Sequence, residues 1–439
     1  MERVCVVGVW HQGAVAAACL ADAGYTVIGF DHNQDRVHDL NKGKAPLFEP
    51  GLDDLLAKAI KSGRLSFTSD IKQGLADVRD IVIAFDTPVD ENDEIDLSEI
   101  YMTAREMAPY LIPDSVILVT AQVPVGTSGK IAALIRETNP QADFGIAYSP
   151  ENLRLGQAIE RYKSPPMPVI GADSVETLNR VEKLFSPFPV SWMRMSLRSA
   201  EMTKHALNAF LAVSICFANE IGNLCDEVGA DAQQIARGLR LEPRIGPKTM
   251  LFPGLGFSGG TLARDMHTLQ HLGDRVGCDT HLIDGALVAN RHQNGLVVKN
   301  LRKIFGSLDG IHVCVLGLTY KPDTSTLRRS VSIEIIHDMV SQGAIVKAYD
   351  PMADRQELSR HMEFEFCADA YLAAEGCDVL ILITPWPEFK QLNYQRIRTI
   401  MKRPLIFDPQ NTLDPEQLSQ IGFVHLGIGR GTSIDKGAI

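Results

Sequence analysis

Short, apolar, β-branched segments alternate with helix-like segments, and this alternation limits the possible folds more than any other feature. Residues 3–9 (RVCVVGV) predict a strand, and a glycine-containing turn and an alanine-rich helix lead to a second strand at 26–31. Together they form a β-α-β unit of about thirty residues. The pattern predicts an α/β fold with a parallel sheet and helices on both faces. Further strands are predicted at 80–85, 115–120, 144–149 and 167–172.

The alternation stops near residue 197 and then returns. Residues 199–229 predict one long amphipathic helix, and more helix follows up to residue 242 and over 263–305. Strands are then predicted at 312–318, 344–350, 378–384 and 404–408. We therefore expect an N-terminal α/β domain, a helical middle and a C-terminal α/β domain, with boundaries at 1–198, 199–305 and 306–439.

Composition excludes several classes of protein. A chain of 439 residues is too long for one hydrophobic core. Its net charge of −11 argues against a nucleic-acid or anionic-membrane partner. The sequence has no unbroken apolar run of about 18 residues and no secretory signal pattern. The eight cysteines show no CxxC pair or metal-ligand spacing, so we expect buried, reduced thiols, a cytoplasmic protein and no metal site.

The first β-α turn resembles a dinucleotide-binding fingerprint. It reads GVWHQG, so Gly8 and Gly13 match the first and third glycines of G-x-G-x-x-G, while Trp10 replaces the second. Asp31 follows about twenty residues later, where an acid suits the ribose hydroxyls of NAD and repels the extra phosphate of NADP. These residues predict NAD binding. A nucleotide-free α/β domain with a helix-capping turn is the alternative.

Ten motifs, in order and at fitting intervals, resemble the UDP-glucose/GDP-mannose dehydrogenase family over almost the whole chain. They are FEPGL (48–52), DTP (86–88), VPVGT (123–127), SPENLRLGQA (149–158), SAEMTKHALNAFLA (199–212), NE (219–220), RIGP (244–247), PGLGFSGGTLARD (253–265), GLTYKPDTSTLRRS (317–330) and AYDP (348–351).

The resemblance implies two Rossmann-like, doubly wound domains joined by a long central helix that also forms the core of a homodimer. The N-terminal domain would bind NAD and the C-terminal domain would hold the nucleotide of a nucleotide-sugar substrate. Enzymes of this family oxidise a primary alcohol twice, to a carboxylate, with two NAD. A cysteine attacks the intermediate aldehyde, and the resulting thioester is hydrolysed after the second hydride has left.

This chain departs from the family pattern in the second half of that reaction. The family's cysteine falls on Thr261, its catalytic threonine on Gln122 and its second glutamate on Leu155, while the first glutamate is kept as Glu151. The loop lysine becomes Arg264. The lost groups are those that make and hydrolyse the thioester.

The groups that the family uses for hydride transfer are all present. Lys204 and Asn208 lie four residues apart and therefore on one helical face, and Asp265 is kept. In the family these residues hold the alcohol or water and stabilise developing negative charge. Thr261 could be a nucleophile, a hydrogen-bonding group for the substrate, or a packing residue. We disfavour the first, because a threonine hydroxyl needs an adjacent base and the loop has no histidine.

The resemblance also predicts the remaining site residues. Glu151 is predicted to be catalytic, with a helix-capping acid after Pro150 as the alternative. His11 lies in the cofactor turn, and from that position we expect an exposed loop histidine. The predicted cofactor-binding residues are Gly8, Trp10, Gly13, Asp31, Thr87, Pro88 and Gln122. The predicted substrate-binding residues are Leu153, Arg244 (from the partner subunit in the family), Phe257, Gly259 and Lys321.

Three hypotheses about function follow. We favour an NAD-dependent oxidoreductase that removes one hydride from a nucleotide sugar, either to give a carbonyl or as part of an epimerisation. The first alternative is a four-electron 6-dehydrogenase that works by an altered route. The second is a non-catalytic protein that binds sugar nucleotides.

Overall fold

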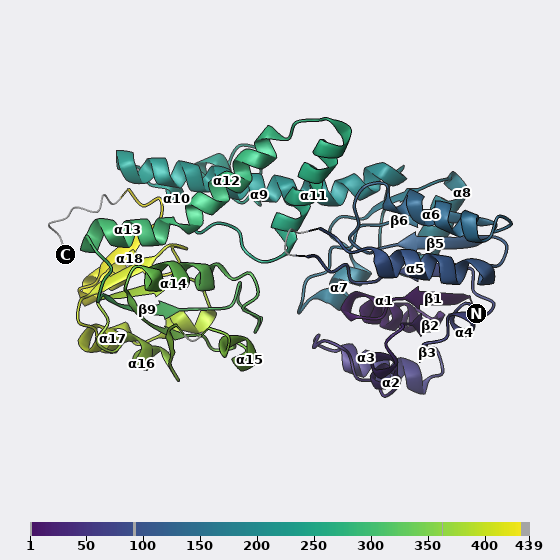
Figure 1. Ribbon diagram of the computed structural model, residues 1–439, viewed down its shortest axis with the longest axis horizontal. Coiled ribbons are helices and arrows are strands. Elements are labelled where there is room, and N and C mark those ends of the chain that lie inside the picture. The colour runs from purple at the N-terminus through teal and green to yellow at the C-terminus, as the bar shows by residue number, and fades with distance from the viewer. Residues whose placement is uncertain (1, 91–93, 362, 432–439) are drawn as a thin grey trace. The chain divides into compact units, whose positions relative to one another are not determined.

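The computed structural model describes residues 2–90, 94–361 and 363–431, which belong to two compact units, Met1–Leu207 and Asn208–Ile439 (Figure 1). Each unit contains its own sheet, and the expected α/β class is confirmed. The long helix α9 (Leu197–Val228) starts in the first unit and continues in the second.

The first unit is built on an eight-stranded sheet in the order β3-β2-β1-β4-β5-β6-β7-β8. Its strands are β1 (Arg3–Val7), β2 (Thr26–Phe30), β3 (Leu65–Thr68), β4 (Asp80–Ile83), β5 (Ser115–Val119), β6 (Phe144–Tyr148), β7 (Val169–Ala172) and β8 (Met193–Ser196). Its helices are α1 (His11–Asp22), α2 (Gln34–Asn41), α3 (Leu52–Lys61), α4 (Ile71–Gly74), α5 (Ser98–Met107), the 3-10 turn η1 (Ala108–Tyr110), α6 (Thr127–Thr138), α7 (Ala158–Lys163) and α8 (Val175–Leu184).

The apolar run of β1 explains why this sheet is covered on both faces. Val4 and Val6 belong to one buried cluster, whereas Cys5 and Val7 belong to another. Successive side chains of a strand point to opposite faces, so an unbroken apolar run is suited to a strand buried on both sides. Helix α1 contributes to the first cluster and α6 to the second.

One pairing in this sheet differs from the expectation of a wholly parallel sheet. Strand β7 runs antiparallel to β6, with Ala147 opposite Ala172 and Tyr148 opposite Gly171. The hydroxyl of Ser149, just after β6, donates to the carbonyl of Val169 at the start of β7 (2.9 Å). The segment that connects β6 to β7 therefore begins and ends at the same edge of the sheet. A connection between parallel strands would instead have to cross one face of the sheet.

The predicted central helix is confirmed as α9, and α10 (Ala232–Leu239) follows it. The predicted stretch 263–305 is divided into α11 (Thr261–Val276), α12 (His281–Asn294) and α13 (Leu296–Phe305). Gly277, with φ of 67°, ends α11 in a left-handed conformation that favours glycine. Within the second unit, α9, α11 and α12 share a small apolar cluster that includes Ala212, Met266 and Leu287.

Among the described residues, α9 is the one helix whose length and mean hydropathy (1.3 over 18 residues) would suffice to cross a membrane. The sequence has no unbroken apolar run there, because polar residues interrupt it. A core helix of a soluble protein passes the same test, and 44% of that window is buried within the structure.

The second unit contains a six-stranded parallel sheet in the order β11-β10-β9-β12-β13-β14. Its strands are β9 (His312–Leu316), β10 (Ile345–Tyr349), β11 (Glu365–Phe366), β12 (Val379–Leu382), β13 (Leu405–Asp408) and β14 (Val424–Gly427). Its remaining helices are α14 (Val331–Ser341), α15 (Arg355–Leu358), α16 (Ala370–Ala374), the 3-10 turn η2 (Pro387–Gln391), α17 (Tyr394–Ile400) and α18 (Pro415–Ile421).

The two sheets begin with the same local construction. Gly8 after β1 and Gly317 after β9 have φ of 85° and 91°. Each donates its N–H to the last residue of the neighbouring strand at 2.8 Å. The N–H of the next residue donates to a buried aspartate, Asp31 at 2.9 Å and Asp350 at 2.7 Å. Both halves are therefore Rossmann-like, as expected from the sequence.

Candidate functional site

The strand order of the first sheet reverses between β1 and β4, and ligands of open α/β sheets bind at such a point, beyond the carboxyl ends of the strands. A pocket of about 300 Å³ lies there. Trp10, Ala84 and Asp86 line it together with Glu151 and Leu153. The structure thus brings one predicted cofactor residue next to two residues predicted from a distant motif.

The turn after β1 retains the geometry of a dinucleotide site despite Trp10. A β-carbon on Gly13 would lie 1.8 Å from the carbonyl oxygen of Gly8, so α1 packs directly against the end of β1. Trp10 has an ordinary φ of −67° and precedes α1. Its side chain does not cap the helix, so the first amide groups of α1 can receive an anion. The turn therefore fits the pyrophosphate of a dinucleotide.

Asp31 is buried at the end of β2, beside this turn. One carboxylate oxygen accepts the N–H of Val9 and the guanidinium of Arg36 (2.7 Å), and the other accepts the N–H of Asn33 (2.9 Å). The guanidinium of Arg36 also lies 4.9 Å from the centre of the Trp10 ring. The predicted ribose-binding acid is thus fixed in place, with its negative charge partly balanced by one arginine.

Thr87 and Gln122 lie where β4 and β5 end, as expected for residues that face a cofactor. The buried hydroxyl of Thr87 donates to the backbone carbonyl of Gln122 at 2.9 Å. The amide of Gln12 donates to the carbonyl (3.1 Å) and the hydroxyl (2.9 Å) of Thr120. These bonds join the two strand ends to the glycine turn. Pro88, the next predicted cofactor residue, is exposed.

Two residues of α9 that sequence reasoning did not select hold the Gln122 loop. Glu201 is completely buried, and its carboxylate accepts the N–H groups of Gly126 (2.6 Å) and Ser128 (2.8 Å) at the start of α6. The imidazole of His205, also buried, lies 2.9 Å from the carbonyl of Val123. They lie one turn apart on the helix that carries Lys204. Many pairs of residues on a helix share this spacing, so it did not single out these two.

The loop that carries Glu151 is fixed by Glu49 of the FEPGL motif. The buried carboxylate of Glu49 accepts the N–H groups of Gly156 (2.9 Å) and Ala158 (2.8 Å). It also lies 3.2 Å from the imidazole of His11. The prediction that His11 is an exposed loop residue is therefore wrong, because it starts α1 and is mostly buried against this acid. Glu151 itself accepts the N–H of Leu153.

The predicted hydride-transfer residues are buried on helices. Lys204 and Asn208 occupy α9 one turn apart, and both are buried. Within the described part of the first unit, the ammonium of Lys204 makes no hydrogen bond or ion pair. In the second unit, the side-chain amide of Asn208 donates to the carboxylate of Asp265, a fully buried residue of α11. The carboxylate thereby fixes the orientation of the amide.

Thr261 is the first residue of α11 and is exposed. Its hydroxyl makes no hydrogen bond to another side chain in the ranges that the structure describes. The preceding Gly259 has φ of 80° and donates its N–H to the carbonyl of Arg329 at 3.0 Å. A β-carbon there would lie 2.9 Å from the ring of Tyr320. The loop is therefore pressed against the second sheet domain, whereas the hydroxyl of Thr261 lacks an activating base.

Amide side chains of α12 and α9 hold the rest of the glycine-rich loop. Asn290 accepts the N–H of Phe257 at 2.7 Å and donates to the carbonyl of the same residue at 3.1 Å. Gln293 donates to the carbonyl of Gly254 at 2.6 Å, and Asn219 accepts the N–H of Gly254 at 2.8 Å. Phe257 and Asn290 are both buried, so the predicted substrate loop has a rigid support.

Two other predicted substrate residues, Lys321 and Arg244, also belong to the second unit. Lys321 follows Tyr320, and its ammonium lies 5.5 Å from the centre of the Tyr320 ring. Arg244 is 87% exposed and pairs only with its neighbour Glu242, at 2.8 Å, in the described ranges. A pocket of about 800 Å³ in this unit is lined by α9, α13 and the last two strands, and it contains none of the predicted substrate residues.

Comparison with known proteins agrees with this geometry. Three segments match the UDP-glucose/GDP-mannose dehydrogenase family: residues 2–189 its NAD binding domain, 198–292 its central domain and 314–415 its UDP binding domain. The described turn, with Gly8, Gly13 and Asp31, lies in the NAD binding segment.

Relatives match over nearly the whole chain. A UDP-glucose 6-dehydrogenase of Rhizobium meliloti (strain 1021) is 36% identical, over 98% of this chain and 99% of its own length. The UDP-glucose 6-dehydrogenase TuaD of Bacillus subtilis (strain 168) is 34% identical, over 98% and 94%. Among solved structures, a UDP-glucose dehydrogenase of Pyrobaculum islandicum superposes with a TM-score of 0.86 at 28% identity, covering 98% of each chain. The chain belongs to the UDP-glucose/GDP-mannose dehydrogenase family and is an NAD-dependent nucleotide-sugar dehydrogenase.

Proposed function

We propose that this enzyme removes a single hydride from one alcohol of a UDP- or GDP-linked sugar and stops at the carbonyl. The observation that carries the proposal is the state of Thr261, which stands where the family has its cysteine. It is exposed, and no side-chain base among the described residues is hydrogen-bonded to its hydroxyl, whereas Lys204, Asn208 and Asp265 are kept and buried. The loss is confined to one half of the family's reaction.

Bound NAD supplies the hydride acceptor. The alcohol carbon loses a hydride and its hydroxyl loses a proton, so negative charge develops on the oxygen. The resemblance assigns that oxygen to Lys204 and Asn208. The ammonium of Lys204 has no carboxylate partner in the first unit, and the amide of Asn208 is oriented by Asp265. A cation and an aligned amide dipole stabilise such a charge best when they are buried and preorganised.

A second oxidation would need a covalent intermediate that these residues do not support. A free cysteine has a pKa of about 8.5, so some reactive thiolate is present near neutral pH, whereas threonine reacts only with an adjacent base. Hydrolysis would also lack the second glutamate, which is Leu155 here. A secondary alcohol cannot be oxidised twice, so it suits this site best. Oxidation followed by reduction, giving an epimer with NAD retained, is a variant of the same chemistry.

The second candidate is a four-electron 6-dehydrogenase, and the relatives favour it. The two named above are UDP-glucose 6-dehydrogenases, and residues 314–415 match the UDP binding domain of the family. These similarities favour uridine as the base of the substrate. The similarity to these relatives does not change the fact that this chain has a threonine at position 261, where the family has its nucleophilic cysteine.

We further propose a homodimer formed through α9, and the three domains expected from the sequence. Helix α9 has an exposed apolar stripe in the single chain, formed at helical spacing by Phe210, Phe217, Leu224 and Val228. A second copy of the chain would cover this stripe. The exposure of Arg244 agrees with a residue that reaches the partner's substrate. The cytoplasm is the proposed location, since all eight cysteines are free and seven are buried.

Substitution of Thr261 tests the proposed function. If the reaction ends after one hydride, Thr261→Ala should keep kcat within about tenfold, whereas loss of an essential nucleophile costs at least about 10⁴-fold. Lys204→Ala is the comparison, and it should lower kcat by about 10²–10³-fold, as removal of an oxyanion donor does. Equal and severe losses in both variants would contradict the proposal. Calorimetric titration with UDP- and GDP-sugars would identify the base.

A further inference from the structure

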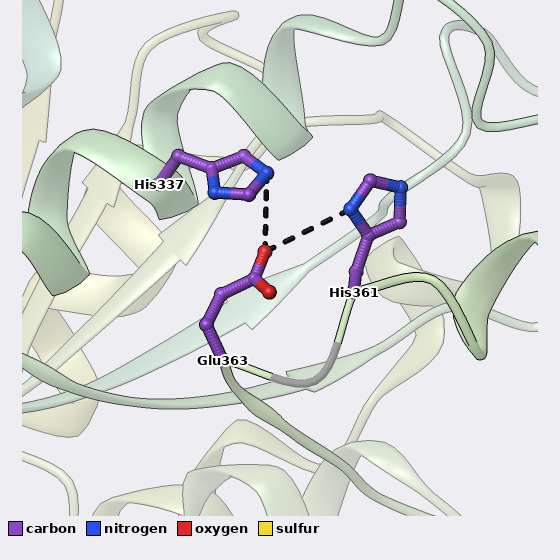
Figure 2. Close-up of side chains that lie close together, drawn as sticks. All are labelled: His337, His361 and Glu363. Carbon is purple, nitrogen blue, oxygen red and sulfur yellow. Dashed lines mark ion pairs between the residues drawn. The ribbon is translucent and has the colours of Figure 1, made fainter.

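Two histidines and a glutamate converge on one point of the second unit, and none of them is a predicted site residue (Figure 2). His337 projects from α14, while His361 and Glu363 come from the segment between α15 and β11. The Nε2 atom of His337 lies 3.1 Å from Oε1 of Glu363, and Nδ1 of His361 lies 3.7 Å from the same oxygen. All three potential ligand atoms lie within 4.8 Å of one another.

The two nitrogen–oxygen distances are close to those between ligands of one small cation. Zinc is bound at 2.0–2.1 Å by imidazole nitrogen and at 2.0–2.2 Å by carboxylate oxygen, with tetrahedral angles, so two ligand atoms of one site lie about 3.3–3.5 Å apart. The two observed separations, 3.1 and 3.7 Å, lie on either side of that value. The third separation, between the two imidazole nitrogens, is at most 4.8 Å, so a cation could contact all three atoms after the partly exposed side chains move closer together.

The carboxylate oxygen at the centre is at ion-pair distance from both imidazoles, yet it forms no hydrogen bond in the described part of the chain. Oε1 of Glu363 is shielded from solvent and accepts no hydrogen bond from any residue within 2–90, 94–361 or 363–431. A buried polar atom without a hydrogen bond destabilises the fold, and does so more strongly when it is charged. A cation held jointly with two imidazoles would remove that destabilisation. His337 is half exposed, so solvent could supply a fourth ligand.

The backbone that carries these side chains is held by the core of the same domain. His337 lies next to Ile336 on α14, and Ile336 is fully buried. His361 donates its N–H to the carbonyl of Leu358 at 2.9 Å. Phe364, directly after Glu363, packs against the apolar cluster that contains Ile336 and Leu358. The three ligands are thus positioned by one packed core, as a preformed site requires.

We propose that His337, His361 and Glu363 form a binding site for a divalent transition metal of the zinc type. Two imidazoles and one carboxylate suit zinc, cobalt or nickel, whereas magnesium and calcium prefer sites made of oxygen ligands only. The metal clamps α14 to the segment that leads into β11, the edge strand of the six-stranded sheet. It acts on the domain's stability and is independent of the hydride-transfer residues.

The competing account is a hydrogen-bonded cluster in which protonated imidazoles pair with the carboxylate. Metal binding requires neutral imidazoles and so releases protons if either is charged. Both accounts use the same contacts, so binding must be measured directly.

The test is calorimetric titration of the full-length protein with Zn²⁺ at neutral pH, with Co²⁺ absorption as a spectroscopic readout of tetrahedral nitrogen and oxygen ligands. One equivalent should bind. Loss of a second-shell partner alone weakens metal sites about 10–100-fold, so Glu363→Gln and His337→Ala should weaken binding at least as much. His38→Ala, which removes an exposed histidine from helix α2, is the matched control and should bind as the parent does.

The melting temperature supplies a second measurement, because a ligand that binds only the folded state raises it. Zn²⁺ should raise the melting temperature of the parent and of His38→Ala, but not that of Glu363→Gln. Circular dichroism of metal-free Glu363→Gln should match that of the parent, which separates lost binding from lost folding. Absence of stoichiometric binding, or equal Zn²⁺ affinity in parent and Glu363→Gln, would overturn the proposal.

Discussion

Replacement of Glu201 by glutamine should destabilise the first unit strongly, although the change removes only one charge. The carboxylate is 0% exposed and accepts two N–H groups from the first turn of α6, at 2.6 and 2.8 Å. A glutamine keeps one acceptor oxygen, but its NH₂ group must face the other N–H. The helix start also loses a negative charge that its dipole favours.

The magnitude follows from these two losses. A hydrogen bond to a charged group contributes about 1.5–3 kcal/mol, and a negative charge at a helix N-terminus about 0.3–1 kcal/mol. Glu201→Gln should therefore lower the free energy of unfolding by about 2–4 kcal/mol. The matched control is Glu227→Gln on the same helix. Glu227 is 75% exposed and lies 3.5 Å from Lys303, so its loss should change stability by less than about 0.5 kcal/mol.

Urea unfolding followed by circular dichroism gives the difference in stability. Amide hydrogen exchange of the segment 123–138 shows where it arises, because the N–H groups of Gly126 and Ser128 should lose protection first. If Glu201→Gln is no less stable than Glu227→Gln, or if exchange in that segment is unchanged, the assigned role of Glu201 is wrong.

Three further predictions concern the cofactor turn, the thiols and the dimer. Gly13→Ala should abolish NAD binding measured by calorimetry, because the new β-carbon would lie 1.8 Å from the backbone oxygen of Gly8. The control is Gly129→Ala in α6, whose β-carbon would have no neighbouring atom within 4 Å, and this variant should bind NAD normally. Equal NAD affinities in the two variants would contradict the assigned turn. Burial raises the pKa of the seven buried thiols, so at neutral pH they hold almost no thiolate. A thiol reagent should then modify Cys278 alone, by mass spectrometry, and leave activity intact; inactivation by such a reagent would point to a thiol in catalysis. Leu224 lies on α9 and is 61% exposed, and Leu224→Arg should convert the proposed dimer to a monomer in light scattering. The control is Leu282→Arg, at a 70% exposed residue of α12, which should leave the dimer intact. A dimer that persists in both variants would place the interface elsewhere.

The sequence predicted the inner strands of both sheets and missed the outer ones. Strands β3 and β8 form the edges of the first sheet, and β11 and β14 those of the second. None of the four was predicted. Strand β8 (MRMS) is mostly exposed and β11 has two residues. An edge strand is held by backbone pairing on one side and needs no continuous apolar run, so hydrophobic patterning gives little signal for it.

The candidate site also contains residues that the sequence predicted and residues that it did not. Motifs predict the glycines, the ribose acid and the family's catalytic positions, because each has a fixed interval to its neighbours in the sequence. Glu49 and Glu201 could not, because they act on backbone N–H groups more than 70 residues away in the chain. Backbone groups are the same in every residue, so such a pairing leaves no pattern in the sequence. The contact of the His11 side chain with the Glu49 side chain was also missed, because the two residues are 38 positions apart and no motif joins them.

The number of NADH molecules formed per nucleotide sugar tests the central claim most directly. Purified enzyme would be given excess NAD and a limiting amount of each candidate UDP- or GDP-sugar, with NADH measured by absorbance and the product by mass spectrometry. A single oxidation predicts one NADH and a product lighter by two hydrogens, and the epimerase variant predicts none and no change of mass. Two NADH per sugar with a carboxylate product would contradict the account and show that the second oxidation proceeds without the cysteine.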